Sequence, residues 1–470
     1  MSKRKILFFE LNEVPLRIVR QFCGAAPGST LAKNLHRMRQ IRTQAPDSVL
    51  SPWITWPTLH RGVDDAVHGL RFFGQDLTEV DARYPPLWRL LAAHGVKTGV
   101  FGSLHSYPMP EDVRGYAFYM PDTFAPAPDA HPDTLAVFQD FNLTMARKSA
   151  RNVSRDVPGK GAFQLLRAIP DLGIRASTLA DVSRQLVSER IHDWQRIRRR
   201  TYQSVLGFDV FMKQMEDTRP DFATFFTNHV ASAMHRYWAA SFPGDFTALE
   251  YDWSWVARYR HEIEFAMSKF DAFLTRLIEF VERNPDYVLW IASSMGQAAS
   301  SGQPVKTQLY ITDLARFMTC AELGGDDWSE RPAMAPRISV FVRESKRDAF
   351  RATLDTFKVN GEAVAWEERS NGFFAICMGQ MNLDPSARIE INGQARSLSE
   401  AGLSNVEIED QAGSTAYHVP EGMLLVFDPL AAQPEAAPEL PLDTRQIAPS
   451  VLRHFGVPVP SYMVDPVPLA

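Results

Sequence analysis

Short apolar runs, each followed at once by polar residues, recur along the chain. The clearest are residues 6–9, 222–226 and 287–292. Continuous apolar runs of this length, with polar residues at their ends, are typical of strands buried in a parallel sheet. Ligands bind beyond the carboxyl ends of such strands, so the polar residues that follow each run are the first candidates for a functional site.

Helical spacing of apolar residues separates these runs and predicts helices between the strands. The helices are expected at 16–22, 87–95, 230–238, 253–283 and 444–455. Further strands are expected at 97–101 and 423–427, whereas 51–60, rich in proline and tryptophan, is predicted to be a loop. Strands that alternate with helices predict an α/β fold, a mostly parallel sheet sandwiched between helices.

Two segments depart from this alternation. Residues 104–200 hold few strand-like runs, several prolines and then an arginine-rich helical part, which predicts an inserted helical cap. Residues 337–415 combine a strand, a helix and alternating strands, which predicts a small α+β insertion. The core then comprises 1–103, 201–336 and 416–470. The arginines of the cap are interpreted as a solvated helix face, with a surface for an anionic substrate or partner as the alternative.

The composition is that of an average globular protein. Of 470 residues, 45% are hydrophobic and 22% charged, which excludes a disordered or collagen-like chain. With 50 basic and 55 acidic residues the net charge is −5, so we expect no nucleic-acid partner. No apolar stretch reaches the length of a membrane span or a signal peptide, and three scattered cysteines suit a reducing compartment. We therefore expect a cytoplasmic protein.

A series of motifs follows along the chain. They are Ile6-Leu7-Phe8-Phe9-Glu10-Leu11-Asn12, Thr55-Trp56-Pro57-Thr58 with His68-Gly69, Pro220-Asp221 through His235-Arg236-Tyr237-Trp238, Trp290-Ile291-Ala292-Ser293-Ser294-Met295-Gly296, and Tyr417-His418-Val419-Pro420-Glu421-Gly422. Their order resembles the alkaline phosphatase superfamily, and within it the nucleotide pyrophosphatase/phosphodiesterase branch, over nearly the whole chain. The resemblance implies an alkaline-phosphatase-like core and a hydrolase whose Thr or Ser hydroxyl attacks phosphorus between two metal ions, usually zinc.

The chain departs from the family at the metal ligands. Asn12 stands where the family has its first Asp, Ser294 and Met295 where it has Asp and His, and Ala231 where it has a further Asp. Amide, hydroxyl and thioether groups are poor ligands for a hydrolytic zinc ion. The resemblance therefore implies a divergent, depleted metal site.

Three histidines remain as candidate ligands. His235 and His418 are carried over from the resemblance, and His229 is an addition outside the family pattern. Three imidazoles and a water form a known catalytic set. We therefore expect at most one divalent ion, zinc or a similar metal, on His235, His418 and His229.

The resemblance makes Thr55 the candidate nucleophile. Because the metal ligands are depleted, a histidine is the remaining candidate for the general base, either His235 or His229. Four further residues are candidates for substrate binding: Asn12, Arg61, Asn228 and Ser294. Two of them have an alternative role, since Asn12 is suited to cap the helix that begins near residue 15 and Arg61 to form a surface salt bridge.

Two functions are compatible with these residues. The first is a divergent hydrolase or transferase that acts through Thr55 on a small anionic ester, a phosphate ester or diester before a sulfate ester. The second is a catalytically inactive relative that keeps the fold as a binding or scaffolding module. The retained Thr55, His235 and His418 favour the first, and the depleted ligand set favours the second. The sequence leaves the oligomeric state open.

Overall fold

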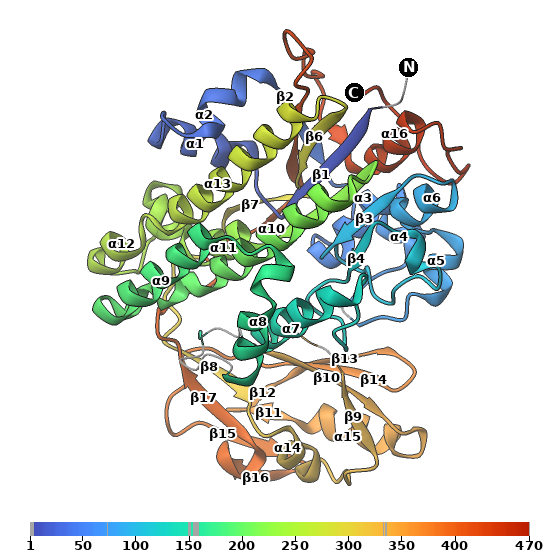
Figure 1. Cartoon of the computed structure of the whole chain (residues 1–470). Helices are drawn as coiled ribbons and strands as arrows, with labels where there is room; N and C mark the ends of the chain where they lie inside the picture. The colour runs from blue at the N-terminus through green and yellow to red at the C-terminus, as the bar shows by residue number, and fades with distance from the viewer. Residues whose placement is uncertain are drawn as a thin grey trace.

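A central sheet organises the molecule (Figure 1). The computed structural model describes residues 4–72, 74–148, 152–153, 159–331, 333 and 336–469, and within them this sheet has eight strands in the order β20-β2-β19-β6-β1-β5-β3-β4. Its strands are β1 (Lys5–Leu11), β2 (Met38–Gln44), β3 (Thr98–Phe101), β4 (Phe118–Met120), β5 (Phe222–Thr227), β6 (Tyr287–Ala292), β19 (Glu421–Phe427) and β20 (Leu442–Asp443). β1 runs parallel to β5 and β6, while β19 is antiparallel to β6 and β2. The predicted α/β fold with a mostly parallel sheet is confirmed.

Helices cover both faces of the sheet. One face carries α1 (Leu16–Ala25), α2 (Thr30–Asn34), α10 (Arg199–Thr218), α11 (His229–Ser241), α12 (Trp253–Tyr259) and α13 (Glu262–Arg283). The other face carries α3 (Pro52–Arg61), α6 (Leu87–Ala93) and α16 (Ile447–His454). The short helices α4 (Asp65–His68) and α5 (Thr78–Arg83) follow α3.

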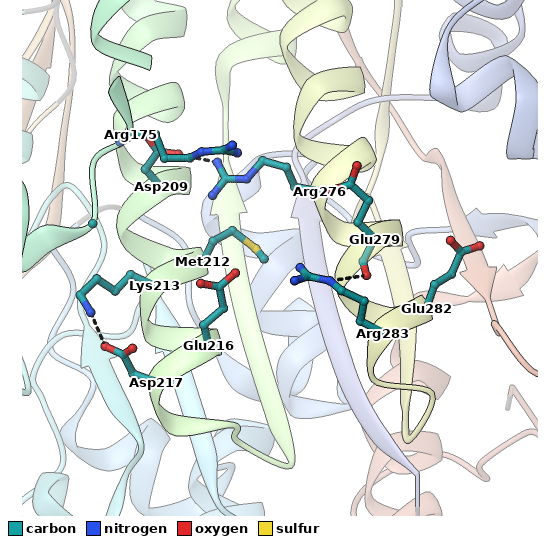
Figure 2. A pocket seen from close by; sticks show the side chains of 11 residues that line it. Arg175, Asp209, Met212, Lys213, Glu216, Asp217, Arg276, Glu279, Glu282 and Arg283 are labelled. Atoms are coloured by element: carbon teal, nitrogen blue, oxygen red, sulfur yellow. Dashed lines mark hydrogen bonds and ion pairs between the residues drawn. The ribbon is translucent and has the colours of Figure 1, made fainter. Parts of the chain in front are cut away.

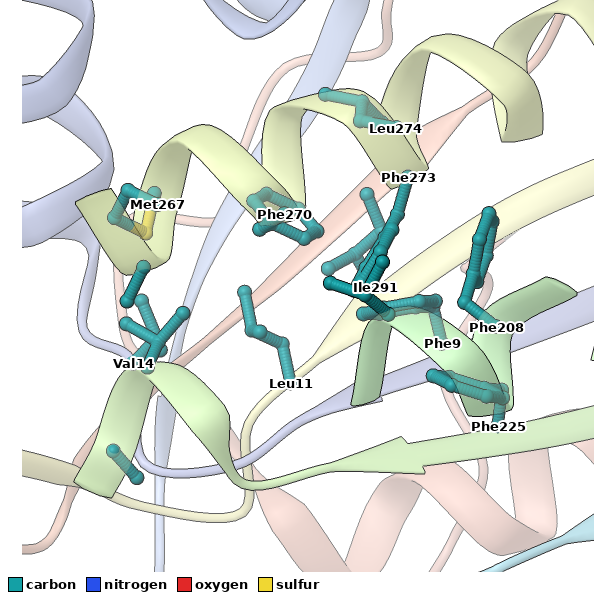
Figure 3. Close-up of a cluster of buried hydrophobic side chains, with 14 of the residues drawn as sticks. Phe9, Leu11, Val14, Phe208, Phe225, Met267, Phe270, Phe273, Leu274 and Ile291 are labelled. Carbon is teal, nitrogen blue, oxygen red and sulfur yellow. The ribbon is translucent and has the colours of Figure 1, made fainter. Parts of the chain in front are cut away.

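The alternation of side chains along β1 divides the core in two. Leu7, Phe9 and Leu11 point into the first layer, where Phe9 lies 5.6 Å from Phe270 of α13 and 5.3 Å from Phe225 of β5, measured between ring centroids (Figure 3). Ile6 and Phe8 belong to the second layer. Because both faces are covered, β1 is apolar on both from Ile6 to Phe9, as a central parallel strand requires. Glu10, on the second face near the end of the strand, is buried and lies 2.7 Å from Nε2 of His60.

Two predicted elements differ from the structure. Residues 51–60 are not a loop but largely the helix α3. Pro52 occupies its first turn, where the missing N–H is not needed, and Pro57 lies inside the helix. The single helix predicted over 253–283 is two helices, α12 and α13, which are separated at Arg260 and His261.

The segment predicted as a cap is largely helical where the structure describes it. It holds α7 (Ala136–Lys148), α8 (Gly159–Leu172) and α9 (Ala176–Ile191). Several arginines at its end form ion pairs with carboxylates of this chain: Arg196 with Glu409, Arg198 with Glu262 and Arg199 with Glu189. Arg198 thus links the predicted cap to α13, Arg196 links it to the 337–415 segment, and Arg199 pairs with α9 of the cap itself.

A separate apolar cluster, running from Leu309 to Leu403, lies in the lower part of Figure 1. Its helices are α14 (Leu314–Cys320) and α15 (Arg347–Thr356). Its strands are β8 (Thr307–Ile311), β9 (Trp328–Arg331), β10 (Arg337–Val342), β11 (Lys358–Val359), β12 (Glu362–Ala363), β13 (Ala365–Ser370), β14 (Phe373–Cys377), β15 (Arg388–Ile391), β16 (Gln394–Ser397) and β17 (Leu403–Glu407). The domain boundaries at 104–200 and 337–415 stay predictions. None of the helices in the described ranges has the length and apolar character that a membrane crossing needs.

Candidate active site

A buried carboxylate stands directly beyond β1. The strand ends at Leu11, and Glu13 follows with a backbone φ of 60°, a left-handed conformation that is uncommon for a residue with a side chain. Strain of this kind is found where the surroundings hold a residue in place, often at functional sites. The Glu13 side chain is 2% exposed. It therefore needs partners for its charge.

Two imidazoles supply those partners. The Oε2 atom of Glu13 lies 2.9 Å from Nε2 of His235 and 3.5 Å from Nε2 of His418. One ligand atom from each of the three residues lies within 4.8 Å of the other two. Among the described residues, this is the one such group of histidine, cysteine and carboxylate side chains.

The orientation of both imidazoles is determined by the main chain. Nδ1 of His235, on α11, donates to the carbonyl of Ala416 at 2.8 Å, and Nδ1 of His418, on β18 (Ala416–Val419), donates to the carbonyl of Leu50 at 2.8 Å. Both Nε2 atoms are thereby turned toward Glu13. Histidines that bind metals show the same pattern, with the second ring nitrogen bonded to a carbonyl or carboxylate.

Electrostatics couple these groups. Burial raises the pKa of the Glu13 carboxyl, but the charge of His235 and the hydrogen bonds from His235 and His418 outweigh it, and the pKa lies well below its ordinary range. Burial lowers the pKa of His418, yet its hydrogen bond and charge interaction with Glu13 raise the pKa above its ordinary value overall. Glu13 is thus ionised, and it is the anion that a cation in this place would meet.

Asn12 connects the carboxylate to two other elements. Its Nδ2 donates to Glu13 Oε1 at 2.8 Å and to Asn228 Oδ1 at 2.7 Å, and its Oδ1 accepts from Nε1 of Trp56 at 2.7 Å. It does not cap α1, because the residue at the helix start is Pro15 and no side chain caps it. Asn12 therefore lies in the site beside Glu13.

Thr55 lies on α3, and hydrogen bonds connect the chain around it to His418 and Asn12. The residues Leu50 and Trp56 on either side of it are bonded to His418 and Asn12. The Thr55 hydroxyl lies 2.8 Å from the hydroxyl of Ser294 and 3.1 Å from the carbonyl of Ser51, and its side chain is fully buried. The structure thus pairs two predicted site residues, Thr55 and Ser294.

The expected histidine base beside Thr55 is not found in this arrangement. His235 faces Glu13, and His229 lies 2.7 Å from the Thr227 hydroxyl through Nδ1 and 3.2 Å from the Ala266 carbonyl through Nε2. Burial lowers the pKa of His229 to about 3, so it is a neutral residue of the core. The group that could hold a metal ion contains Glu13, His235 and His418, and His229 is not part of it.

Arg61 also has a different role from the one predicted. Its side chain is 1% exposed and donates to Asp81 at 2.7 Å and to the carbonyl of Tyr84. A guanidinium held by a carboxylate in the interior is not available for an anionic substrate. Arg61 is therefore part of a buried ion pair, not the surface pair of the alternative interpretation.

The residues present fit one divalent ion. Glu13 Oε2 with His235 Nε2 and His418 Nε2 is the set of two histidines and a carboxylate that holds catalytic zinc in other enzymes. The other positions at which the sequence motifs place metal ligands offer none here: Ala231 and Met295 are buried apolar residues, and the Ser294 hydroxyl is bonded to Thr55.

Sequence reasoning missed two members of the site, Glu13 and Gln297. Glu13 belongs to the polar cluster after the first strand, which was the available signal. Gln297 lies on β7 (Gly296–Ala299), pairs with His418 across the strands and donates from Nε2 to Glu13 Oε2. Its place in the site depends on the pairing of β7 with β18, which are far apart in the sequence, so no local sequence pattern predicts it.

A groove of about 760 Å³ runs between α10 and α13 (Figure 2). Charges of both signs line it, including Lys213, Arg276 and Glu279, and an ion pair joins Arg276 to Asp209. None of the predicted site residues lines this groove.

Of three comparisons with known proteins, the comparison with solved structures found similar proteins. No protein-family model matches the sequence, and no curated protein matches it. Murine ectonucleotide pyrophosphatase/phosphodiesterase 5 is 10% identical with a TM-score of 0.42, covering 99% of this chain and 97% of its own. Phosphonoacetate hydrolase from Sinorhizobium meliloti 1021, in complex with phosphonoacetate, is 12% identical with a TM-score of 0.41, covering 95% and 98%. A mutant of the alkaline phosphatase PafA is 13% identical with a TM-score of 0.46, covering 99% and 98%.

All three belong to the alkaline phosphatase superfamily, which is the family that the sequence motifs resemble. At identities and TM-scores this low, the likenesses say nothing about residue roles or substrates in this chain.

Proposed function

We propose that the protein is a metal-dependent hydrolase of small anionic esters. Phosphate esters or diesters are the substrates we favour, and sulfate esters are the second choice. One observation carries the proposal: the ionised Glu13 meets Nε2 of His235 and of His418, while main-chain carbonyls hold both Nδ1 atoms. Two imidazoles and a carboxylate, oriented in this way, are a ligand set for zinc.

The charge of Glu13 and the solvent exposure of His235 are consistent with metal-dependent ester hydrolysis. A divalent ion bound there would supply Lewis-acid activation of an ester oxygen and of an attacking hydroxyl. Glu13 offsets one of its two charges, so the centre would keep a net positive charge that attracts an anion. His235 is 26% exposed, which leaves the centre open to solvent on that side.

Thr55 is the proposed attacking group. The chain is tied to the site on both sides of this residue: the Leu50 carbonyl, just before α3, accepts from His418, and Trp56 on α3 donates to Asn12. To attack, its hydroxyl has to leave Ser294 and turn toward the bound ester, a rotation about one side-chain torsion. Asn228, exposed and bonded to Asn12, is the proposed substrate contact at the rim.

The experiment is a metal analysis of the purified protein, followed by assays with chromogenic phosphate monoesters, phosphodiesters and sulfate esters. The expected result is one zinc or similar ion per chain and turnover that a chelator abolishes and zinc restores. Two tightly held ions per chain contradict the single site. The products show whether water or another hydroxyl receives the group, which separates a hydrolase from a transferase.

The alternative, a catalytically inactive binding module, is favoured by one observation. The Thr55 hydroxyl is fully buried and already bonded to Ser294, so it does not face a free substrate in this structure. A protein that binds anionic esters without cleaving any of them would establish this alternative. A cytoplasmic location stays a prediction from the sequence.

A further inference from the structure

Gln297 contacts all three elements that carry the proposed ligands. Its Nε2 donates to Oε2 of Glu13 and, at 3.2 Å, to the carbonyl of Ala231 on α11. On β7 it stands directly opposite His418 of β18 in the antiparallel pair. Residues directly opposite each other across such a pair have neighbouring side chains.

The Ala231 carbonyl lies one helical turn before His235. In an α-helix the carbonyl of one residue accepts the N–H of the fourth residue after it, so Ala231 belongs to the turn that carries His235. The amide of Gln297 thus ties that turn to the carboxylate of Glu13.

The chemistry of the amide explains why it is oriented this way. Glu13 Oε2 and the Ala231 carbonyl are both acceptors, so the NH₂ group has to face them, and the side chain is 2% exposed. Its Oε1 is buried without a hydrogen-bond partner in the described structure. Leaving a buried acceptor unpaired costs free energy. The unpaired Oε1 is therefore an unfavourable contribution to stability that accompanies the two hydrogen bonds donated by Nε2.

We propose that Gln297 is a positioning residue of the metal centre, which holds Glu13 Oε2 in place to bind the ion together with His235 and His418. This inference rests on the proposed function. Carboxylates that ligate metals are themselves hydrogen-bonded, and removal of such a partner typically lowers metal affinity about 10–100-fold.

The test is Gln297→Met, which keeps the shape of the side chain and removes its donors. Metal-free protein is titrated with Co²⁺, whose visible absorption reports the ligand geometry, and with Zn²⁺ against a chromophoric chelator. Gln308→Met is the matched control, because Gln308 is equally buried and donates to two carbonyls, of Met378 and Gln380, away from the site.

We expect Gln297→Met to weaken Co²⁺ and Zn²⁺ binding about 10-fold or more and to change the cobalt spectrum, while Gln308→Met changes neither. The thermal midpoint of the metal-free protein separates a positioning role from a structural one: a structural role lowers that midpoint and leaves metal affinity unchanged. If Gln297→Met does not fold, Gln297→Asn, with a shorter amide that cannot span both acceptors, takes its place with a smaller expected loss of affinity.

Wild-type affinity in Gln297→Met overturns the inference and leaves the proposed function standing. A wild-type protein that binds no Co²⁺ or Zn²⁺ overturns both.

Discussion

The carboxylate of Glu13, just beyond the first strand, lies 2.9 Å from Nε2 of His235 on helix α11. The Glu13 side chain is almost completely buried, whereas the His235 side chain is partly exposed to solvent. With His418 as the third member, the group joins the segment after β1, the helix α11 and the strand β18, which pairs with β7.

Glu13→Gln should abolish metal binding. The amide lacks the negative charge that makes Glu13 a ligand, and a neutral carboxamide is a poor partner for zinc. We expect less than about a tenth of the wild-type zinc content, measured by elemental analysis, since ligand loss removes more affinity than loss of an outer partner. The control is Glu264→Gln, which removes a glutamate that lies 2.9 Å from a histidine, His261, on the surface. Equal zinc in both variants would place the ion elsewhere.

Asn12→Asp should make stability depend on metal. The change removes the Nδ2 donor to Glu13 and Asn228 and sets a second carboxylate beside Glu13. Buried like charges without a cation are costly, and we expect a loss of about 2–3 kcal/mol in the free energy of unfolding of the metal-free protein. Added Zn²⁺ should recover most of it, as urea unfolding with and without the ion would show. A loss that zinc does not change would mean that Asn12 is structural only.

Thr55→Ala should lower turnover at least about 100-fold if Thr55 attacks the ester. Thr55→Ser keeps the hydroxyl and should retain most of the activity. A buried hydroxyl contributes about 1 kcal/mol to stability, so both variants should unfold near the wild-type midpoint. The measurement is turnover of an ester that the wild type cleaves, at equal zinc content. Full activity in Thr55→Ala would leave water as the attacking group.

Asp47→Asn should flatten the dependence of stability on pH. Burial raises the pKa of the Asp47 carboxyl from an ordinary 3.8 to about 7, although hydrogen bonds from Thr58 and the Asp65 amide lower it in part. The folded state therefore prefers the protonated form. Its contribution to stability is full below pH 3.8 and is lost as the pH rises toward 7, at up to about 1.4 kcal/mol per pH unit.

Urea unfolding at pH 4, 5.5 and 7.5 checks this prediction. Asp47→Asn should be more stable than the wild type at the highest of these values, and the difference should shrink toward the lowest. Asp355→Asn, an exposed substitution on α15, serves as the control and should follow the wild type. A wild-type curve parallel to that of Asp47→Asn would contradict the raised pKa.

Much of the sheet was predictable because its strands are continuous apolar runs. β1, β5 and β6 lie where the sequence placed them, since strands buried on both faces have no polar alternation to obscure them. β2 was not predicted, because polar and apolar residues mix along Met38–Gln44 and its pairing with β19 is long-range. The helix α3 was mistaken for a loop because it contains two prolines: Pro52 in the first turn, where proline is tolerated, and Pro57 inside the helix, where proline is normally unfavourable.

The sequence by itself determined the class of fold and two of the three residues in the cluster, His235 and His418, because these depend on local apolar pattern and on motif order. Only the tertiary structure decided the third. Glu13 replaces His229 because a left-handed turn after β1 brings its carboxylate to the imidazoles, while His229 bonds to Thr227 and Ala266 inside the core. A side chain's direction at a strand end depends on packing between distant elements, and no local sequence pattern encodes that packing.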